Sequence, residues 1–289
     1  MPVTITARAL PSGPWDPAGR SLHRLVDAYG CTLDVLPSSG TAFPHRHSGY
    51  ELLIVHERPV LLRIGDWFDV LRPGDALLFP AGSLHASRPL LGSYLRTLIH
   101  FLPDFAGRHE LLERPYAEPQ RFHLRPAQSA PIGLATERLR TTALTEGERR
   151  RALIHLLDAL ATAQPVRDES LHPAVRDALA CLRVNPDERL TLKALARACC
   201  VSEGYLCQLF RSAFGCPPQR LRQFIAIDRV CRQLPTGEQN VAELAAAAGF
   251  ATRRGLQRAF LRVTGRTIEA YQGELRSRLA TGGLTQPTA

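Results

Sequence analysis

The sequence predicts an α+β protein: an N-terminal β-barrel of the jelly-roll type, then helices, then an all-α C-terminal domain with two helix-turn-helix units. Three observations predict this order. Short β-type runs split by Gly and Pro fill residues 31–101, and leucine stripes follow at 129–163. A motif at 190–215 then recurs at 240–265. Many short strands with turn signals are typical of antiparallel barrels, and a helix, tight turn and second helix are typical of proteins that enter the DNA major groove.

The chain of 289 residues is long enough for two domains. We expect a barrel domain over 1–128, a helical region over 129–163 and a DNA-binding domain over 170–280. The start of the sequence lacks a basic leader followed by an apolar core, and the longest apolar runs are far below the ~20 residues that a membrane span needs. We therefore expect a cytoplasmic protein without a membrane partner.

The strands of the N-terminal domain are expected where apolar and β-branched residues lie between turn formers. These runs are Cys31–Leu36, Tyr50–Val55, Val60–Ile64, Trp67–Leu71, Ala76–Phe79 and Tyr94–Phe101. Leucine and isoleucine at helical spacing then predict two helices between 129 and 163, whose apolar stripes are expected to belong to the core. Residues 164–173, with two prolines and several charges, are expected to form the linker.

The first copy of the C-terminal repeat has the residues that begin and end two helices. One apolar helical face consists of Leu192, Leu195, Ala196 and Cys199. Ser202 is expected to be the N-cap of the second helix, because its hydroxyl can accept a free backbone N–H. That helix is expected to bury Leu206, Leu209, Phe210 and Phe214. Gly215 is expected to end it as a C-cap, and Pro217 and Pro218 prevent its continuation.

The second copy repeats this pattern. Gly249 lies in the turn, Leu256 and Phe260 are expected on the buried face, and Gly265 closes the unit. Between the copies, residues 219–234 are expected to form one helix that holds the two units at a fixed spacing. A protein that reads two groove segments needs its recognition helices about 34 Å apart, which is one turn of DNA.

The charge is concentrated in the same part of the chain. Residues 170–289 contain 17 Lys and Arg against 9 Asp and Glu, whereas residues 1–169 contain 19 against 18. Nearly all of the net charge of +9 therefore lies in the segment that contains the repeat. Basic helices are often only solvated faces, but this does not explain why the charge coincides with the repeat. The asymmetry indicates a polyanionic partner, double-stranded DNA.

The outward positions of the second helix in each copy are the candidates for contact with bases. They are Gly204, Tyr205, Cys207, Gln208 and Arg211 in the first copy, and Arg253, Arg254, Gln257, Arg258 and Arg262 in the second. Arg and Gln have the donor and acceptor geometry that suits guanine and adenine edges. We expect the more basic second set to contribute more affinity. The alternative for any one of these arginines is a phosphate contact, which positions the protein but specifies no base.

Residues 171–275 resemble the DNA-binding domain of AraC/XylS-type transcription regulators. The motifs that carry the resemblance are Leu195-Ala196, Val201-Ser202, Tyr205-Leu206, Leu209-Phe210, Phe214-Gly215, Pro218, Leu244-Ala245, Gly249-Phe250 and Phe260. The sequence departs from the family at Cys200, where a turn-former such as Gly is usual, and at Ala226-Ile227, where Arg-Leu is frequent. It also departs at Leu256, where Phe is usual, and at Ile268, where Pro is usual. The resemblance implies a sequence-specific transcription regulator, most often an activator, with RNA polymerase as a further partner and no enzymatic activity.

The N-terminal domain resembles a cupin. The motifs are His45-x-His47-x-x-x-Glu51 and Gly74-x5-Pro80-x-Gly82-x-x-His85. The first is looser than the second, since Gly40 lies one residue nearer than usual and Arg58 replaces a later Gly; Pro89 stands where Asn is usual. In cupin enzymes His45, His47, Glu51 and His85 correspond to the ligands of a divalent metal. Three imidazoles and a carboxylate suit iron, manganese, nickel or zinc.

A small-molecule effector pocket is the favoured interpretation of this domain over a bound metal, because barrel mouths are common ligand sites. The pocket candidates are His45, His47, Glu51, His85, Arg46, Trp67, Phe79 and Tyr94. The resemblance also implies that the helices over 129–163 either pair two subunits in a homodimer or pack back on the barrel.

The leading hypothesis is an effector-responsive activator. Two alternatives stay open: a cupin metalloenzyme tethered to DNA, and a constitutive DNA-binding protein with an empty barrel.

Six of the seven cysteines lie between Cys181 and Cys231. Disulfides are not expected in a cytosolic chain, and no C-x-x-C pair indicates a zinc ribbon. Cys199 is expected in the core. Cys200 and Cys207 are expected near DNA beside arginines that favour the thiolate, which leaves a thiol-sensing role open.

Overall fold

A computed structural model of the chain describes residues 31–38, 49–65, 67–92, 94–113, 120–141, 144–163, 171–184, 190–234 and 240–280. The strands are β1 (Cys31–Ser38), β2 (Tyr50–Glu57), β3 (Val60–Ile64), β4 (Trp67–Leu71), β5 (Asp75–Phe79), β6 (His85–Pro89), β7 (Tyr94–Phe101) and β8 (Gln120–His123). The helices are α2 (Pro103–Ala106), α3 (Glu110–Glu113), α4 (Pro126–Leu139), α5 (Glu146–Ala161), α6 (Pro173–Val184), α7 (Leu192–Ala198), α8 (Glu203–Phe214), α9 (Pro218–Gln233), α10 (Val241–Ala247), α11 (Arg253–Thr264) and α12 (Ile268–Ala280).

The strands form two antiparallel sheets. One has the order β1-β7-β2-β5-β8 and the other the order β4-β3-β6. All six predicted strands are confirmed, and β6 and β8 are added to them. Within the described residues the two sheets are separate hydrogen-bonded units and do not close into one barrel. The α+β class and the order of strands before helices are therefore confirmed, and the closed cupin barrel stays a prediction.

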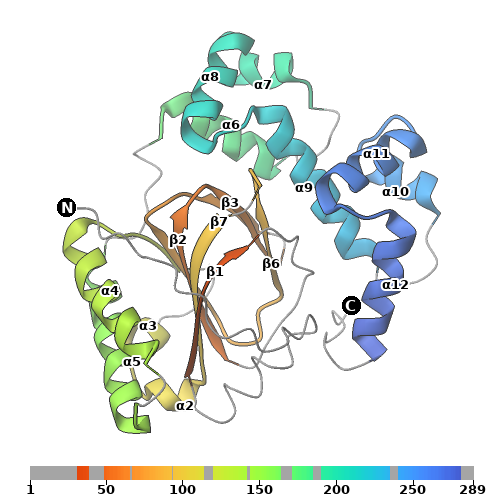
Figure 1. The fold of residues 1–289 in the computed structure, drawn as a ribbon. Coiled ribbons are helices and arrows are strands. Elements are labelled where there is room, and N and C mark those ends of the chain that lie inside the picture. Colours follow the sequence, from red (N-terminus) through yellow and green to blue (C-terminus); the bar gives the residue numbers. More distant parts are fainter. Residues whose placement is uncertain are drawn as a thin grey trace.

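Side chains alternate between the two faces of each strand, so each sheet has an inner and an outer face. The inner faces enclose one apolar cluster, formed by Leu53, Val55, Val60, Leu62, Leu71, Leu77, Phe79 and Leu98. The outer face of the larger sheet packs on α4 and α5, and the outer face of the smaller sheet packs on the C-terminal helices. Figure 1 shows the resulting order, with α4 and α5 on one side of the strands and α6 to α12 on the other.

The helical pair α4 and α5 uses its leucines within the chain. Leu153, Leu156, Leu157 and Leu160 of α5 are fully buried against the sheet. Each such leucine contributes about 1.5–3 kcal/mol by leaving water. Thr145 caps α5 in a reciprocal pair of hydrogen bonds with Glu148. Packing back on the sheet, one of the two expected roles of these helices, is therefore confirmed; their pairing of two subunits stays a prediction.

The C-terminal helices begin and end at the residues that the repeat predicts. Ser202 accepts the N–H of Tyr205 and begins α8, and Thr252 accepts the N–H of Gly255 at the same place in α11. Gly215 and Gly265 end these two helices with φ of 69° and 70°. The left-handed conformation there places the glycine N–H on the carbonyl four residues earlier. The two units are thus closed by the same local chemistry.

Two residues other than glycine have a positive φ in the described part of the chain, Arg58 at 61° and Cys200 at 55°. Both stand where the two resembled families usually have Gly. Cys200 occupies the turn between α7 and α8, and Gly249 has a φ of 83° at the matching position in the second unit. The left-handed conformation costs an L-residue about 1–2 kcal/mol, so Cys200 keeps a strain that Gly249 avoids.

Cys200→Gly is therefore expected to raise the free energy of unfolding by about 1 kcal/mol, after the larger chain entropy lost by glycine is deducted. Chemical denaturation followed by circular dichroism measures this change. Cys207→Gly serves as the matched control. Cys207 lies inside α8, so the same substitution there should lower the free energy of unfolding by about 1 kcal/mol. If both variants raise, or both lower, the free energy of unfolding, the inference that Cys200 is strained is wrong.

Candidate nucleic-acid interface and sensor centre

The two recognition helices are α8 and α11, and each has one buried and one exposed face. Leu206, Phe210 and Phe214 hold α8 against the core, and Leu256 and Phe260 hold α11. The exposed residues of α8 include Gly204, Gln208 and Arg211, whereas Cys207 is half-buried. The exposed residues of α11 include Arg253, Arg254, Arg258 and Arg262, whereas Gln257 is half-buried. The structure thus exposes eight of the ten predicted DNA-binding residues on two equivalent helices and leaves Cys207 and Gln257 half-buried.

The two outer faces differ in charge at matching positions. Gln208 of α8 occupies the place of Arg258 in α11, and Gly204 occupies the place of Arg254. A Cβ added at Gly204 would meet nothing within 4 Å, so this part of α8 is open to a close approach. The first helix therefore offers a nearly neutral, smooth face, and the second offers a cluster of guanidinium groups.

Tyr205 is held by a residue that the sequence did not single out. Its ring lies edge-on to His172, with centroids 5.7 Å apart, and its hydroxyl oxygen is 3.4 Å from His172 Nε2. His172 Nδ1 accepts the N–H of Ala174, 3.2 Å away, so in a neutral imidazole the proton is on Nε2. Nε2 then donates to the tyrosine oxygen, and the hydroxyl proton of Tyr205 is left for another acceptor. In the sequence, the contact with Tyr205 is indicated only by the presence of a histidine, His172, just before α6.

Inside the strand sandwich, Glu51 is the acceptor between two histidines. Its Oε2 is 2.8 Å from His100 Nε2 and 3.3 Å from His85 Nε2. All three residues are buried, with 3 % of Glu51 exposed. Glu51 and His100 lie directly opposite each other in the β2–β7 pairing. Of the predicted pocket residues this centre unites Glu51 and His85, and it adds His100, which was not predicted.

A backbone carbonyl group orients the ring of His85 in this centre. His85 Nδ1 is 3.0 Å from the carbonyl oxygen of Ser83, which only accepts, so Nδ1 donates to it. His85 Nε2 then faces Glu51 Oε2 at 3.3 Å. The apolar interior thus contains a polar centre that can form hydrogen bonds with a small ligand.

The other predicted pocket residues are distributed as follows. Phe79 is fully buried and its ring centroid is 4.4 Å from that of His85. Trp67 is half-buried at the start of β4. Tyr94 belongs to β7, but its side chain is outside the described part, as are His45, Arg46 and His47 altogether.

Because two of the four predicted ligands are outside the described residues, the divalent metal stays a prediction. Among the described residues, no group of three or more His, Cys, Asp and Glu side chains has an arrangement that could hold a metal ion. Glu51 and His85, the two predicted ligands that are described, face each other.

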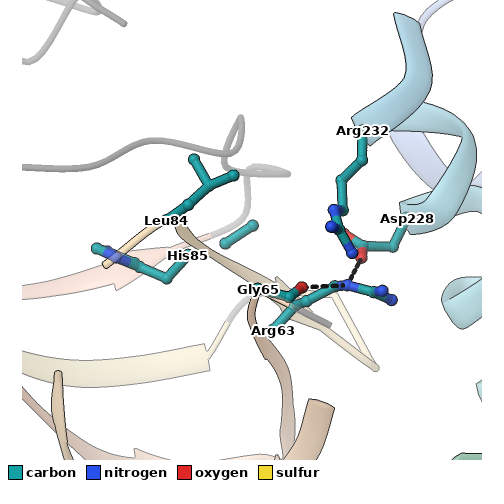
Figure 2. Close-up of a pocket in the computed structure, with 7 residues that line it drawn as sticks. Arg63, Gly65, Leu84, His85, Asp228 and Arg232 are labelled. Carbon is teal, nitrogen blue, oxygen red and sulfur yellow. Dashed lines mark hydrogen bonds and ion pairs between the residues drawn. The ribbon is translucent and has the colours of Figure 1, made fainter. Parts of the chain in front are cut away.

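A small hollow lies where the smaller sheet meets α9. It is lined by Arg63, Gly65, Leu84, His85, Ala86, Asp228 and Arg232. Arg63 Nε is 3.2 Å from Asp228 Oδ2, and both side chains are buried. Figure 2 shows this ion pair crossing the hollow, with the His85 ring pointing away from it into the sandwich. The strand domain and the DNA-binding helices are thus joined by a buried pair of charges.

The cysteines divide by burial. Burial raises the pKa of the thiols of Cys199, Cys216 and Cys231 to about 11, which leaves them protonated near neutral pH. The expected core position of Cys199 is confirmed. Cys200 is exposed and Cys207 is half-buried, so the accessible thiols of this domain include the two that were singled out.

No helix among the described residues combines the length and the apolar character needed to span a membrane.

Comparisons with known proteins agree with the two helix-turn-helix units. A family model described as a helix-turn-helix domain matches residues 195–274. The arabinose operon regulatory protein of Salmonella typhimurium LT2 is 28% identical over 78% of this chain and 83% of its own length. That of Escherichia coli K12 is 27% identical over 70% of this chain and 73% of its own length.

Among solved structures, the C-terminal domain of AraT, a response regulator from Geobacillus stearothermophilus, is 25% identical over 36% of this chain and 87% of that domain, with a TM-score of 0.34. The residues matched by the helix-turn-helix family model include α8 and α11, the two helices that begin and end in the same way. The chain is a DNA-binding transcription regulator that is similar to the two arabinose operon regulatory proteins.

Proposed function

We propose that the chain reads two successive major-groove segments of one DNA duplex, with the outer face of α8 in one and that of α11 in the other. The observation that carries this proposal is the equivalence of the two helices. Both have an N-cap hydroxyl, a buried aromatic face and a left-handed glycine at the end, and both leave their outer face exposed. Because α8 and α11 are held in the same way within one chain, they suit insertion into two major-groove segments about one DNA turn apart.

The charges of the two faces assign them different roles. Arg253, Arg254 and Arg258 are exposed together on the first half of α11, the end that enters the groove in this class of motif. They supply bidentate donors for guanine and attraction to phosphate. In α8, Gln208 and the hydroxyl of Tyr205 supply hydrogen bonds without net charge. The second unit then supplies most of the affinity, and the first adds discrimination at its own segment.

The strand domain is proposed to be the sensor, a cupin-like domain that binds a small molecule and so regulates activation. The buried Glu51–His85–His100 centre supports this, because a polar group in an apolar interior is the usual way to orient a small ligand. A ligand shifts the equilibrium only if it prefers one arrangement of the domains. RNA polymerase as a partner, a homodimer and a cytoplasmic location belong to the same proposal and follow from the role of an activator.

Arg258→Ala tests the assignment of α11. After footprinting has located the binding site, the affinity for that site should fall by about 1–3 kcal/mol if Arg258 contacts a base. The loss should be accompanied by relaxed preference at one base pair of the second segment. A series of duplexes with single base changes, titrated by fluorescence anisotropy, measures both effects. A uniform loss over all sequences, with the salt slope reduced by about one, would assign Arg258 to a phosphate.

Arg138→Ala is the matched control for charge. Arg138 is exposed on α4, on the opposite side of the strands from the recognition helices, and its loss changes the net charge equally. Its affinity for DNA should equal that of the unaltered protein. If Arg258→Ala binds as well as Arg138→Ala, then α11 does not read DNA and the proposed function is wrong in its central point.

A further inference from the structure

One short segment of the strand domain touches the C-terminal ends of both recognition helices. The segment is 88–91, the end of β6 and the two residues after it. Arg88 Nη1 donates to the carbonyl oxygen of Val263, which lies in the last turn of α11, at 3.4 Å. Leu91 packs on Gly215, the residue that ends α8, so closely that a Cβ on this glycine would collide with its side chain. Gly215 and Val263 are near the same end of two equivalent helices.

The setting of Arg88 is unusual for a charged side chain. The residue is 4 % exposed, and its other contact is to the sulfur of Cys231, 3.9 Å from Nη2. Its Nε has no hydrogen-bond partner among the described residues, and in that part of the chain no carboxylate pairs with it. A buried guanidinium with two long contacts gains little for stability, since its desolvation is expensive. The Val263 carbonyl oxygen that it contacts lies at the negative end of the α11 dipole, which favours a cation.

The rest of the segment is apolar and fits the same core. Leu90 is fully buried, and it belongs to the cluster that also contains Phe210, Phe260 and the apolar side of α9. Leu91 is half-buried against that cluster. The segment therefore packs against the core that the two helix-turn-helix units share. Helix α9 joins these units (Figure 1).

Docking of the strand domain leaves the reading faces open. Gly204 and Gln208 of α8 and Arg254 and Arg258 of α11 are exposed in the docked state. The contacts of 88–91 are at the opposite, C-terminal ends of these helices. The strand domain therefore does not cover the DNA-binding residues, and any effect it has on DNA binding must pass through the relative position of the two helices.

We propose that residues 88–91 are a positioning segment that sets the separation and angle of α8 and α11, and so the spacing of the two DNA segments that the protein accepts. Arg88 is the positioning residue for α11, and Leu91 is that for α8. This inference rests on the proposed reading of DNA by both helices. It adds that the strand domain contributes to the choice of DNA site without touching DNA.

The test is the dependence of affinity on the spacing between the two DNA segments. Each inserted base pair moves the second segment by about 3.4 Å and turns it by roughly 35°, since one turn of about 34–36 Å contains about 10 base pairs. The full-length protein should bind one spacing best and lose about tenfold or more for one base pair added or removed, which is about 1.4 kcal/mol. Arg88→Met and Leu91→Ala should each flatten this loss to about threefold or less. Their affinity for a duplex with a single segment should not change.

Arg183→Met is the matched control. Arg183 of α6 also joins the two domains, through hydrogen bonds to Asp69 Oδ1 at 2.8 Å and to the carbonyl oxygen of Phe68 at 3.3 Å in the strand domain. Its spacing preference should stay as sharp as that of the unaltered protein. Circular dichroism and single-segment binding identify a variant that fails to fold, and the milder Leu91→Ala then decides the question.

The outcomes separate the two proposals. If the unaltered protein binds no two-segment site, the proposed function fails. If it binds such a site with a sharp spacing preference that both Arg88→Met and Leu91→Ala retain, the positioning role is wrong. A preference that Arg183→Met flattens equally would assign the effect to domain docking as a whole and would also overturn the role of the segment.

Discussion

Phe260→Ala is expected to lower the free energy of unfolding by about 3–5 kcal/mol, the range for deleting a buried phenylalanine. Phe260 is fully buried in α11, and its ring is edge-on to that of Tyr271, with centroids 5.4 Å apart. Burial also raises the pKa of the Tyr271 hydroxyl, which therefore stays neutral beside the ring. Removal of the phenyl group leaves a cavity at the point where α11 is held, so the reading face loses its support as well.

Urea denaturation followed by circular dichroism measures the effect, and Phe210→Ala is the internal comparison. Phe210 occupies the same place in α8, is fully buried and packs edge-on against Phe214, with centroids 5.5 Å apart. Both phenylalanines belong to one continuous apolar cluster, so the two losses should be of similar size. Leu261, next to Phe260 and 49 % exposed, supplies the control. If Leu261→Ala destabilises the protein as much as Phe260→Ala, the assignment of the buried face of α11 is wrong.

The helix-turn-helix units were predictable because their signals are local. Ser202, Gly215 and Gly265 act through backbone groups three or four residues away, and the apolar spacing between them leaves one way to pack. The two positions with strained backbone also coincide with departures from the resembled families. Cys200 and Arg58 stand where the resembled families usually have Gly, and the structure gives both a positive φ.

Two strands escaped prediction because their residues do not look like strand residues. β6 has the sequence His-Ala-Ser-Arg-Pro, with one residue of clear apolar character before the proline. It is extended because it pairs with β3 along its whole length. β8 is likewise held at the edge of the larger sheet by β5. Pairing with a distant strand, rather than propensity, makes these segments β-structure, and single-sequence patterns do not report it.

The candidate sensor centre was predictable only in part for the same reason. Glu51 and His85 follow from motif spacing, but His100 becomes their partner through the register of β2 against β7. A shift of that register by one residue would turn His100 to the other face of the sheet. The contacts of Arg88 with Val263 and of Arg63 with Asp228 join residues more than 160 positions apart, and no local pattern predicts such pairs.

Asp69→Ala is expected to lower the free energy of unfolding by about 3 kcal/mol, the lower end of the range for breaking a buried ion pair, because the buried Arg121 loses one of its two carboxylate partners. Asp69 accepts from Arg121 Nη1 at 2.6 Å and from Arg183 Nη2 at 2.8 Å, and its side chain is 5 % exposed. Arg121 is as deeply buried and bridges to Asp75 at 2.7 Å. Without Asp69, the guanidinium of Arg121 keeps one carboxylate and loses its shorter hydrogen bond.

Arg183→Ala supplies the comparison, because it removes the other partner of the same carboxylate. The Arg183 side chain is 32 % exposed and thus partly solvated, and Asp69 retains Arg121 when Arg183 is lost. The loss should be about 1.5 kcal/mol, the lower end of the range for a hydrogen bond to a charged group, because water already solvates part of Arg183. Urea denaturation of both variants tests the difference. Equal losses of unfolding free energy in the two variants would mean that Asp69 stabilises the protein mainly through the contact with Arg183 of α6, and not through the buried Arg121.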